Sequence, residues 1–148
     1  RENSLSDFQY KTIIVGTEYS KYPYFVGFYF DLYQHNYPVI LQSEPNNIYD
    51  KNAVKCLIGG EKFGYIKRKD DYGEEIYPNN VRFYKKKYDE YLVRFECSKS
   101  DVLETYLKEI PITILFFTKN NWSKIKIQKP NVSVEDLLKS IHPEILNK

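Results

Sequence analysis

The residues best suited to contact a ligand lie in one short polar segment, residues 44–52, with the sequence EPNNIYDKN. Asn and Asp side chains hydrogen-bond to nearby backbone amides and tolerate left-handed conformations, so this composition predicts a structured turn. Tyr49 and Asp50 stand next to each other in it and would present an aromatic face and a carboxylate acceptor. A second interpretation stays open, in which Tyr49 plugs one end of the fold while Asp50 and Asn52 satisfy amides of the turn.

A β-hairpin is predicted directly after this turn. Residues 53–58 and 62–67 have the alternating pattern of strands, and Gly59-Gly60-Glu61 between them is a short glycine-containing loop of the kind that closes a hairpin. The second strand leads into the sequence GYIKR. Because side chains alternate between the two faces of a strand, Tyr65 and Lys67 should share one face and Arg68 the other, unless the strand bends. Both Lys67 and Arg68 are therefore candidates for a phosphate contact.

The order of these features is similar to the signature of HIRAN domains, a polar turn E/D-P-x-N-x-Y-D-x-N-A followed by a G-Y/H-hydrophobic-basic strand. The close match runs from Glu44 to Arg68 (EPNNIYDKNAVKCLIGGEKFGYIKR). Upstream, Ile14 to Tyr19 (IVGTEY) is similar to the opening strand of the family, and Pro38 to Gln42 to the strand before the turn. The resemblance thus spans Tyr10 to Ile76.

This resemblance implies an OB-like barrel that recognises the 3′ end of single-stranded DNA. It implies that Asp50 accepts a hydrogen bond from the terminal 3′-hydroxyl, and that Tyr49 and Tyr19 flank or stack on the last bases. It also implies that Tyr65 and Arg68 reach a base and a phosphate. A carboxylate repels a phosphate, so Asp50 would distinguish a free 3′-hydroxyl from a 3′-phosphate. The candidate nucleic-acid-binding residues are Tyr19, Tyr49, Asp50, Tyr65, Lys67 and Arg68.

Two positions depart from a DNA-binding member of the family. Glu18 stands where that domain has an Arg, which replaces a cationic contact with an anionic one, and Tyr65 stands where it has a His. Glu18 and the net charge of only +2 leave a second function open, a protein-interaction module on the same barrel without DNA binding. We expect an intracellular module, within a larger helicase or nuclease polypeptide or beside a partner protein. As a DNA-binding module it would work in replication, repair or genome processing.

Short alternating stretches along the chain predict a mainly β fold, a small OB-like antiparallel β-barrel with two or three short helices. A single HIRAN-like domain over residues 1–148 is expected, with the signature in residues 10–76 and the C-terminal strands and helix of residues 91–148 completing the barrel. The predicted strands are residues 10–19, 37–42, 53–58, 62–67, 91–97, 112–117 and 122–128. The predicted helices are residues 101–110, the segment from Ser133 to Pro143 and, more weakly, residues 69–77.

The composition argues against several other functions. No apolar run is long enough to cross a membrane. Two Cys and two His are too few for a Cys/His zinc site, and buried, reduced thiols are expected at Cys56 and Cys97. Asp89, Glu96 and Lys99 lack the spacing of a metal-dependent nuclease, because Glu and Lys must lie two residues apart to share a strand face. We therefore expect no enzyme, no metal and no cofactor.

Two further features have an ordinary structural interpretation. The basic clusters, residues 67–69 and 82–87, are bordered by acidic residues and are interpreted as mixed-charge surface, with a phosphate-tracking groove as the alternative. The aromatic stretch of residues 22–32 and the pair Phe116-Phe117 are expected to be buried and to close the open end of the barrel. If they were exposed, they would instead form a surface for docking another protein.

Overall fold

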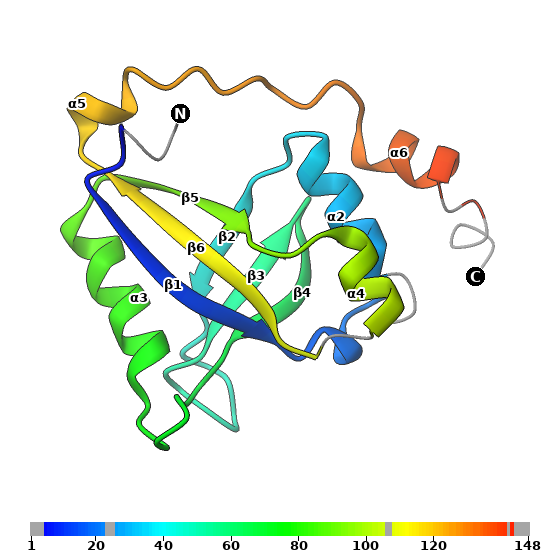
Figure 1. The fold of residues 1–148 in the computed structure, drawn as a ribbon. Coiled ribbons are helices and arrows are strands. Elements are labelled where there is room, and N and C mark those ends of the chain that lie inside the picture. Colours follow the sequence, from blue (N-terminus) through cyan, green and yellow to red (C-terminus); the bar gives the residue numbers. More distant parts are fainter. Residues whose placement is uncertain (1–4, 23–25, 106–107, 142, 144–148) are drawn as a thin grey trace.

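The computed structural model describes residues 5–22, 26–105, 108–141 and 143. One antiparallel sheet of six strands dominates it, with the order β2-β3-β4-β1-β6-β5. Figure 1 shows the long strands β1 and β6 crossing the middle of the molecule, with the β2–β4 strands behind them. The strands are β1 (Phe8–Val15), β2 (Val39–Ser43), β3 (Val54–Ile58), β4 (Glu61–Ile66), β5 (Glu90–Phe95) and β6 (Ile110–Phe117).

The two outer strands of this sheet, β2 and β5, lie next to each other at the seam of the barrel, where side chains hydrogen-bond to the backbone of β2. The backbone N–H of Leu41 in β2 donates a hydrogen bond to the hydroxyl of Tyr91 in β5 at 2.9 Å. The Lys85 ammonium donates to the carbonyl oxygen of the same Leu41. These contacts satisfy edge groups that would otherwise need a strand partner. The sheet is therefore a nearly closed barrel, and the predicted mainly β, OB-like antiparallel fold is confirmed.

Helices lie on two sides of the barrel. α3 (Ile76–Lys87) packs along one side, at the left of Figure 1, while α2 (Val26–Gln34), α4 (Lys99–Thr105) and α6 (Val134–Ile141) gather on the other. A short 3₁₀ helix, η1 (Thr17–Tyr19), follows β1, and α5 (Lys119–Trp122) follows β6. The described residues thus contain five α-helices, more than the two or three expected. No helix in this part of the chain combines the length and the apolarity needed to cross a membrane.

Residues 27–32 of the aromatic stretch are buried, whereas Tyr22 and Val26 are half-buried and residues 23–25 lie outside the described part. Within α2, Tyr29 is 1% exposed and stacks on Phe63 of β4, with ring centroids 5.1 Å apart. Phe30 stacks on Phe95 of β5 at 4.6 Å. Phe116 and Phe117 are both fully buried. The predicted burial is therefore confirmed for these aromatic side chains, although no helix had been predicted at α2.

The predicted strand at residues 122–128 is wrong. The helix α5 ends at Trp122, and residues 125–130 have no regular structure. Thr118 caps α5 by accepting a hydrogen bond from the Asn121 N–H, and the Trp122 ring packs on Phe117 at 5.4 Å. The alternation of Ile125 and Ile127 has no core face behind it, because Ile127 is 51% exposed. The segment instead crosses the outside of the barrel toward α6, at the top of Figure 1.

Three other element boundaries differ from prediction. The strand expected over residues 10–19 ends at Val15, because Gly16 adopts φ 80° and starts η1. The weak helix at residues 69–77 is a turn in which Asp70 accepts hydrogen bonds from the N–H groups of Tyr72 and Glu74. The helix begins at Ile76 with Pro78 in its first turn, where proline costs no hydrogen bond. The helix expected over residues 101–110 starts at Lys99, Ile110 begins β6, and residues 106–107 lie outside the described part.

Candidate nucleic-acid interface

The turn of residues 44–52 is built around Asn47. Its side-chain carbonyl accepts hydrogen bonds from the backbone N–H groups of Tyr49 at 2.9 Å and Asp50 at 3.0 Å. Asp50 Oδ1 in turn accepts from the N–H of Asn52 at 2.9 Å. These local bonds fix the backbone at Tyr49 and Asp50, as the sequence of the turn predicts. Within the described part of the chain, the other carboxylate oxygen of Asp50 makes no hydrogen bond.

The turn carries two large side chains that point into solvent. Ile48 is 87% exposed and Tyr49 is 88% exposed. Tyr49 therefore does not plug the end of the barrel, whereas Asp50 does satisfy a turn amide as that interpretation requires. Holding an exposed aromatic ring on a rigid backbone lowers the entropy lost when the ring contacts a planar partner. The turn thus combines a fixed aromatic face with an adjacent carboxylate oxygen.

Next to the turn, β4 contains a bulge that decides which side chains face outward. Cys56 pairs with Gly64 and Leu57 with Lys62, so Phe63 is an extra residue on β4. Phe63 and Gly64 are consequently both buried, although they are consecutive. A Cβ at Gly64 would lie 2.8 Å from the carbonyl oxygen of Val15, so only glycine fits there. The bulge places Lys62 and Tyr65 on the same outer face.

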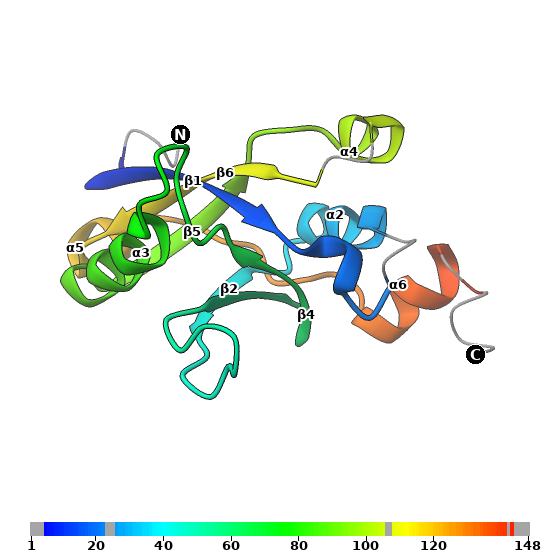
Figure 2. The same cartoon turned by 90° about the horizontal axis from the view of Figure 1, so that it is seen from below.

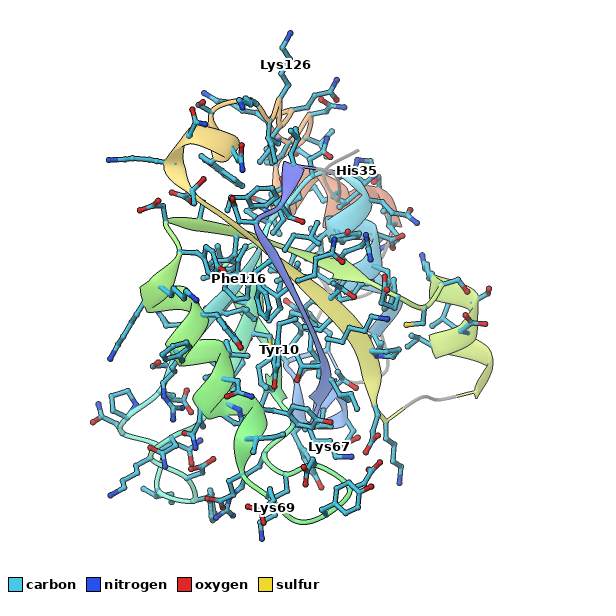
Figure 3. The ribbon with its side chains drawn as sticks, turned by 60° about the vertical axis from the view of Figure 1, so that its left-hand side comes forward. Tyr10, His35, Lys67, Lys69, Phe116 and Lys126 are labelled. Carbon is cyan, nitrogen blue, oxygen red and sulfur yellow. The ribbon has the colours of Figure 1, made fainter. Side chains whose placement is uncertain are left out.

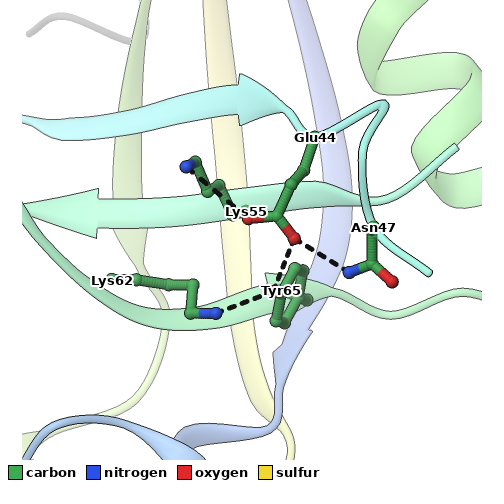
Figure 4. A network of polar contacts seen from close by, with 5 residues as sticks. All are labelled: Glu44, Asn47, Lys55, Lys62 and Tyr65. Atoms are coloured by element: carbon green, nitrogen blue, oxygen red, sulfur yellow. Dashed lines mark hydrogen bonds and ion pairs between the residues drawn. The ribbon is translucent and has the colours of Figure 1, made fainter. Parts of the chain in front are cut away.

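Tyr65 joins this face of the hairpin to the turn through Glu44, as Figure 4 shows. Its hydroxyl accepts from the Lys62 ammonium at 2.8 Å and donates to Glu44 Oε1 at 2.8 Å. The Asn47 amide donates to the same carboxylate oxygen at 2.8 Å, and Lys55 pairs with Oε2 at 3.5 Å. One carboxylate therefore holds the turn, the hairpin and two lysines together. We call these five residues the Glu44 network.

The Glu44 carboxylate has a pKa below its usual value. Burial alone would raise this pKa, but the hydrogen bonds from Tyr65 and Asn47 and the charges of Lys62 and Lys55 outweigh it. The Lys62 ammonium has a raised pKa, because its hydrogen bond to Tyr65 favours the charged form. Both groups are therefore ionised at neutral pH, and the network carries one negative and two positive charges on the surface of the hairpin.

The lowered pKa of Glu44 predicts an acid-sensitive contribution to stability. A carboxyl group whose pKa is lowered by folding stabilises the protein fully above the usual glutamate pKa of about 4.3, and this stabilisation is lost as the pH falls through the lowered value. The Glu44→Gln substitution should cost about 1 kcal/mol at pH 7, since the bonds lie at a partly screened surface. Urea unfolding from pH 7 to pH 3 should show a smaller loss of stability on acidification in the variant. The matched control is Glu18→Gln at an exposed position; an equal change in both variants would contradict this role of Glu44.

Three segments lie around the end of the barrel where Tyr65 is found, namely η1, the turn of residues 44–52 and the loop before α3 (Figure 2). Val15 pairs with Tyr65, and a Cβ at Gly16 would lie 3.9 Å from the Tyr65 ring, so η1 begins beside that ring. Tyr19 at the end of η1 is 85% exposed, which gives this end a second exposed tyrosine. Figure 2 shows η1, the turn of residues 44–52 and the loop before α3 arranged around the ends of β1 and β4. The structure thus brings Tyr19, Tyr49, Asp50 and Tyr65 to one end of the molecule.

Lys67 and Arg68 lie beyond the end of β4, in ion pairs of their own. The Lys67 ammonium lies 2.9 Å from Glu109, and this bond raises its pKa. The Arg68 guanidinium pairs with Glu75 just before α3. In the described part of the chain, neither contacts the Glu44 network. Figure 3 places Lys67 near Lys69 at the lower end of the molecule.

Sequence reasoning missed the two lysines that the structure places against Tyr65. Lys55 is the register partner of Tyr65, which the hairpin could have indicated. Lys62 precedes Tyr65 by three residues, so regular alternation puts it on the opposite face. The signal that could have corrected this is Gly64, because glycine inside a strand often marks a bulge. Glu44 and Asn47 belonged to the recognised turn but had no individual role in the prediction.

Outside this interface, the described residues show neither a metal-ligand cluster nor a cysteine with an activated thiol. No group of three or more His, Cys, Asp or Glu side chains in those residues is close enough to hold a metal ion. Cys56 is fully buried, and burial raises the pKa of its thiol. Burial also raises the pKa of Cys97, which is only half-buried. Neither cysteine forms a disulfide, and a thiol with a raised pKa is a poor nucleophile.

Comparison with solved structures found a similar domain. The crystal structure of the HIRAN domain of human HLTF superimposes with a TM-score of 0.48 and 20% sequence identity, covering 89% of this chain and 87% of that chain. The solved domain bears the name of the family whose signature the turn and hairpin resemble. No family model matches the sequence, and no curated protein sequence matches it.

Proposed function

We propose that this chain is a non-catalytic module that binds single-stranded DNA and recognises its free 3′-hydroxyl end at the turn of residues 44–52. The observation that carries the proposal is the rigid turn, which exposes the Tyr49 ring and leaves one Asp50 carboxylate oxygen without a hydrogen bond to any described residue. A ring can stack on a terminal base, and a carboxylate can accept from a hydroxyl. The HIRAN-like signature of the same segment supports this assignment.

In this proposal, the bases lie across the exposed rings of Tyr49 and Tyr19, and Tyr65 lies between their two segments. Lys62 is better placed than Lys67 or Arg68 to contact the last phosphates, because it adjoins Tyr65 and forms no ion pair within the described residues. Lys67 and Arg68 would have to leave Glu109 and Glu75 before binding a phosphate. We infer that they contribute to binding by their charge more than by direct contact.

We also infer that residues 1–148 act as one HIRAN-like domain, serving replication, repair or genome processing as part of a larger helicase or nuclease assembly. The pairing of the central strand β1 with both β4 and β6 supports a single unit, since it joins the signature region to the C-terminal strands.

The test is fluorescence anisotropy with oligonucleotides of about six nucleotides, within the usual footprint of an OB fold. A 3′-phosphate should weaken binding about tenfold, because it brings a charged group against Asp50. The Asp50→Ala variant should bind the 3′-hydroxyl strand about 10- to 100-fold more weakly, which corresponds to the roughly 1.5–3 kcal/mol of one hydrogen bond to a charged group. The same variant should bind the 3′-phosphate strand no worse than the unmodified protein does.

The matched control is Asp71→Ala, which removes an exposed carboxylate from a different loop. It should leave the preference for the 3′-hydroxyl intact. Equal affinity of the unmodified protein for capped and uncapped strands would refute end recognition at this turn.

A protein-interaction module is the second candidate, and the charge around the turn favours it. Lys67 and Arg68 are paired with acids, and Glu18 is exposed beside Tyr19, so this end of the barrel lacks a continuous cationic surface. This function predicts no measurable affinity for any oligonucleotide even at low salt. It also predicts a protein partner whose binding is lost with Tyr49→Ala.

A further inference from the structure

A second surface lies at the opposite end of the molecule from the turn. Residues 118–134, here called the strap, comprise α5 and the irregular chain that leads to α6. In Figure 1 the strap crosses the molecule above β5 and α2. Figure 3 shows Lys126 projecting into solvent at the end of the molecule opposite Lys67 and Lys69. The strap is therefore separate from the proposed 3′-end site.

The strap is a basic segment without acidic residues. It contains four lysines and no acidic residue, which leaves the rest of the chain with a net charge of −2. These lysines differ from Lys67 and Arg68 in their surroundings, because none of them forms an ion pair with any residue that the structure describes. An unpaired exposed ammonium attracts anions more strongly than one already paired with a carboxylate. The four residues are Lys119, Lys124, Lys126 and Lys129.

Both ends of the strap are fastened to the barrel. At its start, the two carboxylate oxygens of Asp7 accept from the Thr118 N–H at 2.7 Å and the Asn121 amide at 2.8 Å. At its far end, the Tyr37 hydroxyl donates to the carbonyl oxygen of Val132. Lysines held between two fixed points lose less conformational entropy on binding than lysines of a free tail.

A groove of about 1000 Å³ lies between the strap and the seam of the barrel. Its lining includes aromatic side chains from four segments and lysines from the strap, namely Tyr33, Tyr37, Tyr91, Trp122, Lys126 and Lys129. Residues of the two outer strands, including Ile40 of β2 and Leu92 of β5, form further parts of the wall. Outer strands have backbone groups without a strand partner on one side, which can hydrogen-bond to the edge of a base. The groove is thus lined by aromatic side chains and by two lysines of the strap, with Glu90 of β5 as the acidic residue of its lining.

This arrangement matches single-stranded nucleic acid, in which flat bases project from a charged backbone. We propose that the strap and its groove bind the internal phosphodiester backbone and bases of a single strand, without requiring a free end. The positive charge of the strap complements the phosphates, and the aromatic rings complement the bases. Recessed rings would not be needed at an anionic lipid surface, which attracts lysines by charge alone. This proposal does not depend on recognition of a 3′ end at the turn.

The test uses the full chain and a covalently closed circle of about 30 thymidines, several times the footprint of an OB fold. A circle has no 3′ end, so the turn cannot contribute end recognition. Replacing Lys124, Lys126 and Lys129 with Gln should weaken binding at least tenfold at low salt. The slope of log affinity against log salt should fall by about 2, since each phosphate contact contributes roughly 0.7 for single strands. A circle of about 30 uridines should lose affinity for the strap variant to the same extent, if the strap contacts the phosphates that DNA and RNA share. A loss of affinity for only one of the two circles would show that the site is specific for DNA or for RNA.

Two controls separate this proposal from others. Replacing the exposed residues Lys11, Lys86 and Lys108 with Gln removes the same charge elsewhere and should leave affinity for the circle nearly unchanged. Asp50→Ala should also leave it unchanged, so that failure of end recognition and failure of the strap site are distinguishable. The proposal is overturned if the strap variant binds the circle as well as the unmodified protein does. It is also overturned if that variant loses only binding to vesicles of phosphatidylserine and phosphatidylcholine.

Discussion

Replacing both Tyr19 and Tyr49 with Ala should weaken binding of short 3′-hydroxyl oligonucleotides about 100-fold or more. Each aromatic ring that stacks on a base contributes about 1–3 kcal/mol, and the two contributions should add because the rings lie on separate segments. The melting temperature should hardly change, because the two side chains are 85% and 88% exposed. Affinity is best measured by anisotropy at a fixed low salt concentration, alongside thermal unfolding of the same samples.

The matched control is Tyr72→Ala, which removes another tyrosine, 91% exposed, from the loop before α3. Asp70 and Asp71 border this residue, so we expect it to contribute little to binding an anionic strand. A second control, replacement of Tyr19 and Tyr49 with Phe, keeps the rings and removes the hydroxyls, and should keep most of the affinity. Equal losses from Tyr72→Ala and from the paired substitution would show that exposed rings bind without regard to position.

The hairpin beside the turn was predictable because its chemistry is local. Gly59 and Gly60 adopt φ 60° and 83°, and the loop they form joins two strands close to the predicted ranges. The sequence likewise predicts that Asn side chains hydrogen-bond within the turn, and the bonds of Asn47 do join residues at most three positions apart. Local rules therefore account for the backbone that presents Tyr49 and Asp50.

The parts that sequence reasoning missed depend on contacts between distant residues. Glu109 neutralises Lys67 from 42 positions along the chain, and such a pairing leaves no trace in local patterns. The α2 sequence contains two Phe, two Tyr and one Val, residue types that favour strands, yet it forms a helix whose buried side chains pack on the barrel. The same holds for residues 125–130, where alternation was present but no strand partner was available. Tertiary packing decided each of these three outcomes.

The interior has its own aromatic residues, and these do not depend on the tyrosines at the turn end. Phe116 of β6 is central to this interior, as Figure 3 shows. It is the register partner of Phe8 in β1 and of Tyr91 in β5. The rings of Tyr84 and Tyr88, from α3 and the residue after it, lie within 5.7 Å of its centroid.

Phe116→Ala should therefore lower the free energy of unfolding by about 3–5 kcal/mol, the usual cost of removing a fully buried phenylalanine ring. Part of this cost arises at the seam, because Phe116 supports Tyr91, whose hydroxyl accepts from Leu41 of the opposite edge. Thermal and urea unfolding should show the midpoint falling by roughly 10 °C in the thermal case. The control Phe83→Ala, at a position 59% exposed on α3, should cost less than about 1 kcal/mol. Similar losses in both variants would mean that the ring cluster around Phe116 does not hold the seam, which would then depend on the hydrogen bond from Lys85 to Leu41.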